Sequence, residues 1–266
     1  APDGSVGPRL PRFQAFYDKG LEGFLNEARL LGSFDHPSLV KVYRFWAQNG
    51  TAYMVMPYYE GITLKKWLHD LGAPPSERWL RDLADPLMAA LGSMHEQRCY
   101  HRDVAPDNIL MLYDRAAPGS YLEQRPRPVL LDFGAARRVI GDATQQLTAI
   151  LKSGYSPVEQ YEGEESLRQG PWTDVYALCA VLYTAVTGKP PGSSVARVVR
   201  DDMPPAAQVA QGRYSASFLA AIDAGLRVRP EQRPQSMAAL HALMDAPVAP
   251  PAPAAAPAGA AAAAPA

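Results

Sequence analysis

The chain of 266 residues has few cysteines, no long hydrophobic run and almost no net charge. Its two cysteines, Cys99 and Cys179, are far apart and have no metal-ligand spacing around them, which argues against a disulfide framework or a zinc site and fits a reducing cytoplasm. The longest apolar run, 175–187, is too short to span a bilayer and predicts a buried helix. With 26 basic and 27 acidic residues, the composition gives no reason to expect binding to nucleic acid or to an acidic membrane.

What the chain does have is apolar content, 47% of its residues, which is enough to bury a large core. Its pattern divides the sequence into four parts. Residues 1–12 are rich in Pro and Gly and predict an irregular lead-in, and residues 13–60 predict a small unit with one helix and a hairpin. Residues 61–245 are mostly helical in pattern. The nearly pure Ala and Pro of 246–266 predicts a disordered linker.

Local signals place the elements within these parts. Apolar residues at helical spacing predict a helix over 19–33, and two β-rich runs over 39–47 and 51–56 are separated by Gln48-Asn49-Gly50, which is typical of a hairpin turn. Downstream, the patterns predict a long helix over 77–97, interrupted only by Pro86, and short strands over 109–112 and 129–131.

Two short motifs carry the chemistry. The first runs from His101-Arg102-Asp103 to Asn108, and the second is Asp132-Phe133-Gly134 after an apolar run. Phosphoryl transfer needs oxygen ligands for Mg²⁺ and an oriented acceptor for the proton of the nucleophile, and Asp103, Asn108 and Asp132 are residues of these types. Such residues are usually loop caps or turn residues. The order of the two motifs, each beside a strand-like run, favours the chemical interpretation.

These motifs resemble the catalytic loop and the metal-binding turn of protein kinases. The resemblance implies an α+β, bilobal protein-kinase-like fold, with a truncated β-rich N-lobe in 13–60 and a helical C-lobe in 61–245. It also implies ATP and Mg²⁺ as cofactors. Carried over by motif, Asp103 accepts or orients the substrate hydroxyl, and Asn108 and Asp132 bind the metal.

The resemblance extends into the expected N-lobe. Glu27 falls in the ion-pairing position of the family's regulatory helix, with a solvated glutamate on a helix face as the alternative. Around Tyr58 the sequence resembles the fifth strand and the adenine-binding hinge, so Met56 is expected to guard the back of the nucleotide pocket. Pro57 has no N–H, and the hinge donor to adenine is therefore expected to be Tyr59. A plain apolar strand is the alternative.

Further matches lie downstream. Residues 154–159 resemble the end of the activation segment, although Ser156-Pro157 precedes Val158-Glu159 where the family normally has Ala-Pro-Glu. The resemblance implies that Glu159 pairs with Arg233 and that Asp174 holds the catalytic loop. Small-molecule kinases lack this segment, which favours a protein hydroxyl as the acceptor.

Two departures from the family pattern belong together. Where Ser/Thr kinases usually carry a lysine two residues after the catalytic aspartate, this chain has Ala105, and where they usually carry a threonine before the activation-segment glutamate it has Lys152. In the family these two side chains lie close together. The hypothesis is that Lys152 returns the missing positive charge to the transferring phosphate. A surface lysine beside a tolerated alanine is the alternative.

Arg102 points to regulation. An arginine in this position is similar to that of kinases whose activation loop is ordered by a charged group, commonly a phosphate. Thr148 is the first candidate for that phosphate and Thr144 the second, whereas threonines that are only polar spacers are the alternative.

One part of the family pattern is missing. No Gly-rich hairpin and no strand with a phosphate-binding lysine precedes the helix of Glu27. The nearest cations, Lys19 and Lys41, are expected to be surface lysines. The chain starts with Ala1 rather than Met, and the expectation is that upstream residues have been lost from it.

The sequence therefore predicts a bacterial-type (eukaryotic-like) Ser/Thr protein kinase domain that phosphorylates Ser or Thr hydroxyls of proteins with ATP. A pseudokinase scaffold is the alternative, and a small-molecule kinase is a third reading. The expected partners are a protein substrate and ATP, with a regulatory or membrane-linked region beyond the Ala/Pro tail. The expected location is the cytoplasm, either free or as the cytoplasmic part of a membrane-anchored kinase.

Overall fold

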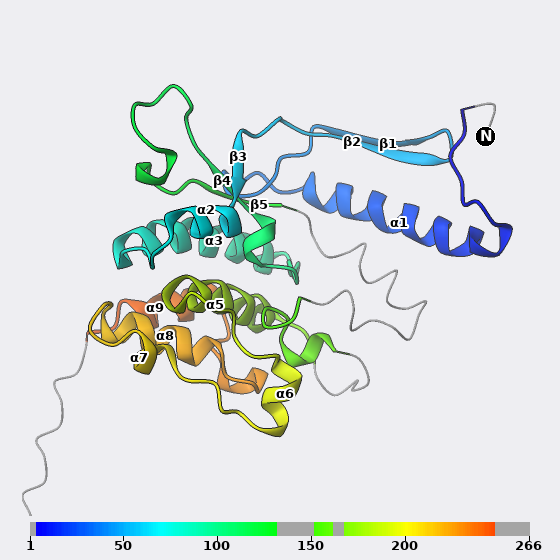
Figure 1. The fold of residues 1–266 in the computed structure, drawn as a ribbon. Coiled ribbons are helices and arrows are strands. Elements are labelled where there is room, and N and C mark those ends of the chain that lie inside the picture. Colours follow the sequence, from blue (N-terminus) through cyan, green and yellow to red (C-terminus); the bar gives the residue numbers. More distant parts are fainter. Residues whose placement is uncertain (1–3, 132–151, 162–167, 248–266) are drawn as a thin grey trace, which may run out of the picture.

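The computed structural model describes residues 4–131, 152–161 and 168–247. It has a small part with one long helix and a hairpin, and a larger part built mostly of helices around a short sheet (Figure 1). The expected two-part α+β arrangement, with a small sheet-containing N-terminal part and a helical C-terminal part, is confirmed.

The small part consists of α1 and a two-stranded sheet. After a single 3₁₀ turn at Pro11–Phe13, α1 spans Gln14–Leu31, and it begins five residues before the predicted residue 19. No Pro or Gly separates Gln14 from that point, so the 3₁₀ turn runs directly into the helix. Strand β1 (Arg44–Gln48) pairs antiparallel with β2 (Thr51–Val55).

The turn between these strands confirms the hairpin prediction. Asn49 and Gly50 have φ angles of 53° and 72°, the pair of positive angles that a type I′ turn requires. A Cβ on Gly50 would lie 2.4 Å from the carbonyl oxygen of Val6, and so only glycine fits where the N-terminal segment crosses the turn.

The predicted start of the first strand was wrong. Residues 39–43 precede β1, and the first two of them pair elsewhere: Leu39 bridges to Leu130, Val40 N donates to Leu130 O (3.1 Å) and Leu130 N donates to Ser38 O (2.8 Å). Leu39 and Val40 are both buried. This segment joins the hairpin to the sheet of the larger part.

That second sheet has the order β3-β4-β5, with both pairs antiparallel. Its strands are β3 (Gly61–Thr63), β4 (Ile109–Leu112) and β5 (Pro128–Leu130). The connection between β4 and β5 carries a 3₁₀ turn, Tyr121–Glu123. Tyr121 packs edge-on against Trp67, a fully buried residue of α2 (Leu64–Leu71), with ring centroids 5.2 Å apart.

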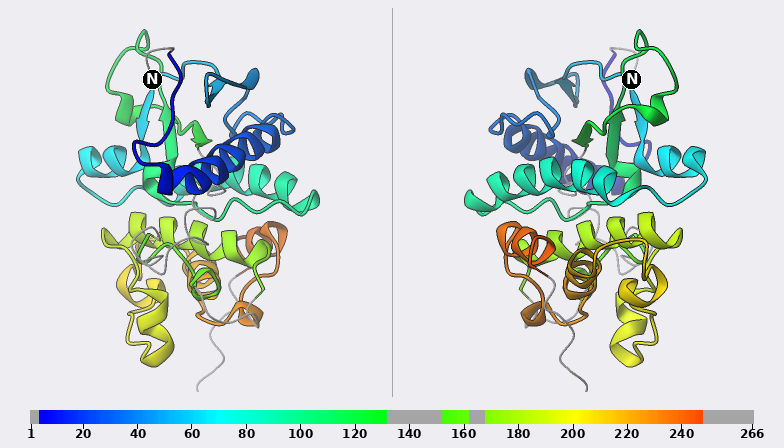
Figure 2. Two further views of the ribbon diagram at one scale, coloured as in Figure 1. Left: turned by 90° about the vertical axis from the view of Figure 1, so that its right-hand side faces the viewer. Right: turned by 90° about the vertical axis from the view of Figure 1, so that its left-hand side faces the viewer.

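The helices are stacked in layers (Figures 1 and 2). Helix α3 (Glu77–Glu96) continues through Pro86, and it lies on α5 (Pro171–Thr187). The remaining helices are α6 (Ser194–Val199), α7 (Ala206–Val209), α8 (Ala216–Gly225) and α9 (Met237–Met244). Three of them, α6 to α8, lie below α5, whereas α9 lies beside α5 and also packs against α3. Because α5 packs against α3, α7, α8 and α9, most of its side chains are buried, as its apolar run predicted.

Within the part of the chain that the structure describes, no helix is both long and apolar enough to cross a membrane.

The contact between α5 and α8 gives a test of this packing. A Cβ added to Gly225 would lie 2.2 Å from Cys179 Sγ, so Gly225→Ala should lower the free energy of unfolding by about 1–3 kcal/mol through overpacking. Chemical denaturation measures the change. Adding Cys179→Ala should recover part of the loss, because it removes the clashing sulfur.

The matched control is Gly92→Ala in α3. Nothing lies within 4 Å of its added Cβ, so the better helix propensity of alanine should raise stability by about 0.5–1 kcal/mol. Equal effects of the two substitutions would contradict the packing described between α5 and α8.

Candidate active site

The loop between α3 and β4 is held by one buried carboxylate. Asp174 of α5 is fully buried, and it accepts hydrogen bonds from the backbone N–H groups of His101 (2.9 Å) and Arg102 (2.7 Å) and from Nε2 of His95 (2.8 Å). Arg102 has a φ of 68°, which is unfavourable for a residue with a side chain. The hydrogen bond from its N–H to Asp174 helps to hold this conformation.

Burial raises the pKa of Asp174, but the hydrogen bonds from His95 and from the Arg102 N–H lower the pKa by more than burial raises it. The net direction is downward. At neutral pH Asp174 is therefore an ionised carboxylate in the interior, compensated by three donors.

His101 connects the loop to the end of β5. Its Nε2 lies 3.1 Å from the carbonyl oxygen of Leu131, and its Nδ1 lies 3.4 Å from the backbone N–H of Asp103. A neutral imidazole with its proton on Nε2 satisfies both contacts. Leu131 N also donates to Asn108 O (2.8 Å), so Leu131 lies beside Asn108. Asp132 itself lies outside the described residues, as do Thr144 and Thr148.

Asp103 and Asn108 are in direct contact. Nδ2 of Asn108 donates to both the backbone carbonyl (2.9 Å) and the side-chain Oδ2 of Asp103. An amide nitrogen must face a carboxylate, so Oδ1 of Asn108 faces away from Asp103 and can serve as a ligand.

Such a donor set fits Mg²⁺, which prefers carboxylate, amide and phosphate oxygens. Across 4–131, 152–161 and 168–247, no group of three His, Cys, Asp or Glu side chains is placed to hold a metal ion.

A cation completes this group. Nζ of Lys152 lies 3.6 Å from Oδ1 of Asp103, and the Asp103 side chain is only 7% exposed. The structure thus brings Asp103, Asn108 and Lys152 together, from a loop and a segment more than 40 residues apart in the sequence.

The segment after Lys152 is fixed to the helical part. Glu159 and Arg233 form a buried bidentate ion pair, with Oε1–Nη1 and Oε2–Nη2 distances of 2.7 and 3.1 Å. Thr173 donates to the same carboxylate (3.0 Å). Next to the pair, Gln160 Nε2 donates to the carbonyl oxygen of Arg102 (2.7 Å), which ties this segment to the loop between α3 and β4.

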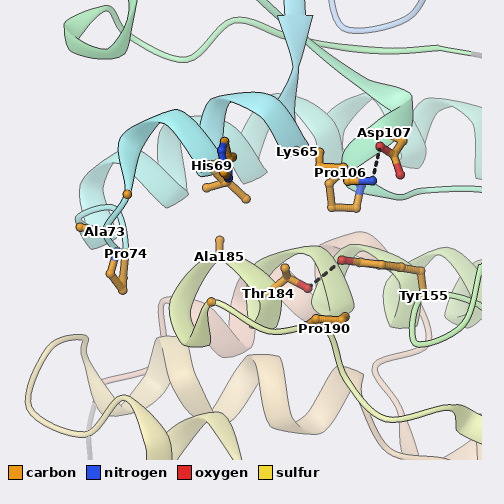
Figure 3. A pocket seen from close by; sticks show the side chains of 13 residues that line it. Lys65, His69, Ala73, Pro74, Pro106, Asp107, Tyr155, Thr184, Ala185 and Pro190 are labelled. Carbon is orange, nitrogen blue, oxygen red and sulfur yellow. Dashed lines mark hydrogen bonds and ion pairs between the residues drawn. The ribbon is translucent and has the colours of Figure 1, made fainter.

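A cavity of about 580 Å³ adjoins the loop, between α2 and α5 (Figure 3). On one side Lys65 of α2 pairs with Asp107 (3.3 Å), and on the other Tyr155 contacts the Thr184 hydroxyl (3.0 Å). Thr184 donates to a backbone carbonyl of α5, so Tyr155 donates to Thr184 and its oxygen remains an acceptor. Burial raises the pKa of Tyr155, which keeps the phenol neutral.

The predicted nucleotide-site residues lie in the small part and the segment after it. Glu27 is buried on α1, whereas Met56 is 42% and Tyr58 87% exposed. The hydroxyl of Tyr59 accepts a hydrogen bond from the backbone N–H of Lys41 (3.0 Å). The roles expected for these residues stay predictions.

The two lysines expected on the surface are exposed. Lys19 lies on α1, and Lys41 pairs with Asp35 at 3.0 Å.

Sequence reasoning missed two residues of the site. His95 and Gln160 belong to no motif, and their only signals are a histidine near the end of an apolar helix and a polar residue after Glu159. Both act on backbone or side-chain groups that are distant in sequence.

Comparison with known proteins gives a consistent result. The family profile described as "Protein kinase domain" matches residues 14–244. The chain is 32% identical over 245 residues to serine/threonine-protein kinase PknB of Mycobacterium leprae, an alignment that covers 88% of this chain and 36% of the relative. With serine/threonine-protein kinase PrkC of Bacillus subtilis the identity is 28% over 191 residues, 71% of this chain and 27% of the relative. The chain spans about a third of the length of these curated relatives.

Solved structures agree. The structure titled "PpkA-294 apo form" is 40% identical with a TM-score of 0.80, over 92% of this chain and 82% of that chain. The PknI kinase domain of Mycobacterium tuberculosis has a TM-score of 0.61 at 20% identity, over 86% of this chain and 81% of that chain. The second likeness shows the fold alone.

The buried ion pair gives a stability test. Glu159→Ala leaves the Arg233 guanidinium buried without its carboxylate, and so the free energy of unfolding should fall by about 3–5 kcal/mol. The double variant Glu159→Leu/Arg233→Met should be more stable than the single variant. Recovery should be partial, because Arg233 also donates to three backbone carbonyls.

Glu231→Ala is the control, since its partner Arg229 lies 3.9 Å away and both side chains are mostly exposed. It should cost less than about 1 kcal/mol. A Glu159→Ala variant as stable as this control would show that the buried pair does not hold the segment.

Proposed function

The chain belongs to the protein kinase family, and from this premise we propose that it transfers the γ-phosphate of ATP to Ser or Thr hydroxyls of proteins. The observation that carries the proposal is the contact of Asp103 with Asn108 and Lys152, on a loop that Asp174 holds from below. It combines a proton acceptor, an oxygen ligand and a cation within one site.

Asp103 is the proposed acceptor for the proton of the substrate hydroxyl. Its backbone N–H is bound by His101 and one of its carboxylate oxygens by Asn108, so its position is set before substrate arrives. The hydroxyl oxygen attacks the γ-phosphorus, the bond to the β,γ-bridging oxygen breaks, and ADP leaves with that electron pair. The proton of the hydroxyl moves to Asp103 and then to solvent.

Asn108 and Asp132 are the residues proposed to hold Mg²⁺. When bound, the metal supplies positive charge to the phosphates. The contribution of this chain is to orient the side-chain amide of Asn108 through its contact with Asp103, and to hold Leu131, the residue before Asp132 in the sequence, against the Asn108 carbonyl.

For the nucleotide we propose the position predicted from the sequence, between Glu27 of α1 and the segment of Met56, Tyr58 and Tyr59. The adenine would take its hydrogen bond from the backbone of Tyr59. The exposure of Met56 and Tyr58 agrees with a segment open to a ligand.

The protein substrate is proposed to lie against the cavity between α2 and α5 (Figure 3). Pro106 and Asp107 line it, and both stand between Asp103 and Asn108 in the loop. A substrate segment in the cavity would therefore place its neighbouring hydroxyl within reach of Asp103. The N–H of Arg102 is bound by Asp174 and its carbonyl by Gln160, so the backbone before Asp103 is fixed. The roles of Thr148 and Thr144 as acceptors of a regulatory phosphate stay predictions.

The cytoplasm is the proposed location, because ATP is available there. A regulatory or membrane-linked region beyond the Ala/Pro tail stays a prediction.

The test is transfer of labelled γ-phosphate from Mg²⁺-ATP to the chain itself and to a generic basic protein. Asp103→Asn should reduce incorporation by about 10²–10⁴-fold, because the amide cannot accept the proton. Asp202→Asn, which changes an exposed carboxylate away from the site, should leave it unchanged. Equal incorporation by the native chain and Asp103→Asn would contradict the proposed mechanism, and none from the native chain would favour a binding scaffold.

A further inference from the structure

We propose that Lys152 binds the transferring phosphoryl group and supplies the positive charge that the catalytic loop itself lacks. The inference rests on the proposed function and assigns a catalytic residue outside that loop. It starts from a distance: Lys152 Nζ lies 3.6 Å from Asp103 Oδ1, on the side of the carboxylate that Asn108 does not occupy.

The cation is placed by a rigid piece of backbone. The carbonyl oxygen of Lys152 accepts hydrogen bonds from the N–H groups of both Tyr155 and Ser156, each at 3.0 Å. Gly154 in this turn has a φ of 85°, and a Cβ there would lie 2.6 Å from the carbonyl oxygen of Pro191. Ser194 then holds the turn from below through the carbonyl oxygen of Ser156 (2.8 Å). Lys152 thus starts from a fixed backbone position.

The loop of Asp103 carries no lysine between residues 100 and 108. Position 105 is an alanine, 1% exposed. Lys65 is engaged with Asp107, and the Arg102 guanidinium lies over the ring of Tyr100 at 5.7 Å. A phosphoryl group that approached Asp103 would meet a negative carboxylate, and Lys152 is the cation placed to offset that repulsion.

The burial of the pair strengthens this effect. The Lys152 side chain is 20% exposed and that of Asp103 is 7% exposed, so their charges interact with little solvent between them. During transfer, the ammonium group of Lys152 keeps its proton and donates a hydrogen bond to a γ-phosphoryl oxygen. It neutralises charge on the phosphoryl oxygens while the bond from the hydroxyl oxygen to phosphorus forms and the bond to ADP breaks.

The experiment removes and then restores the cation at one position. Lys152→Cys takes away the charge, and alkylation of the introduced thiol with 2-bromoethylamine returns an amine on a side chain of nearly the same length. The native cysteines do not compete, because Cys99 and Cys179 are buried, and burial raises the pKa of the Cys179 thiol well above its usual range. Mass spectrometry should show one addition to the variant and none to the native chain.

The expected result is a fall in kcat of about 10²-fold for Lys152→Cys, with recovery of at least tenfold after treatment with 2-bromoethylamine. Treatment with iodoacetamide gives a neutral side chain at the same position and should restore nothing. The KM for ATP should stay close to native in all three forms, since the segment of Met56, Tyr58 and Tyr59 does not include this charge. The thermal unfolding midpoint of both neutral forms should fall by a similar amount, because each leaves the Asp103 carboxylate without its cation, and kcat is therefore measured well below the lowest midpoint.

Two results would overturn the inference. One is a Lys152→Cys variant with a kcat within twofold of native, and the other is equal activity of the charged and neutral alkylated forms, which would reduce Lys152 to a structural side chain.

The native chain and the Asp103→Asn variant are measured in the same assay. They distinguish a failure of the Lys152 inference from a failure of the proposed kinase function. If the native chain transfers no phosphate, the function is overturned and the inference falls with it. If native transfer exceeds that of Asp103→Asn, the Lys152 comparison decides the inference by itself.

Discussion

The rest of the site depends on one interaction, the hydrogen bonds between the buried Asp174 carboxylate and the backbone of the loop of residues 100–108. The carboxylate accepts two backbone N–H groups of the loop and the ring of His95, and it holds Arg102 in a left-handed conformation that costs free energy. Because α5 packs against α3, α7, α8 and α9 and most of its residues are buried, this carboxylate has a rigid base. The position of Asp103 follows directly, one residue after Arg102.

A second set of contacts fixes the opposite wall relative to this loop. The ion pair of Glu159 and Arg233 holds the segment after Lys152, and Gln160 binds the carbonyl of Arg102. The N–H of Arg102 is thus held by the buried Asp174 and its C=O by the half-buried Gln160. The two segments that form the walls of the site are both anchored to the backbone of Arg102. This explains how Lys152 and Asp103, which come from separate segments, stay 3.6 Å apart.

Much of this arrangement could be predicted from the sequence, because short motifs encode it. Asp174, Glu159 and Arg233 were each expected from a local match, and Asn49-Gly50 specified its own turn. Contacts between distant segments could not be predicted in this way. The first strand starts at Arg44 because Leu39 and Val40 pair with Leu130, some 90 residues away, and no local pattern records such a partner. His95 and Gln160 escaped prediction for the same reason.

The most direct test of the central claim is hydrogen exchange at the backbone amides of His101 and Arg102, compared between the native chain and Asp174→Asn. An asparagine must place an NH₂ group where one carboxylate oxygen now accepts a hydrogen bond. We expect exchange at these two amides to accelerate at least about tenfold more than exchange at amides in the middle of α5, which marks a local loss of protection. Exchange that stays as slow as in the native chain would show that Asp174 does not hold the loop.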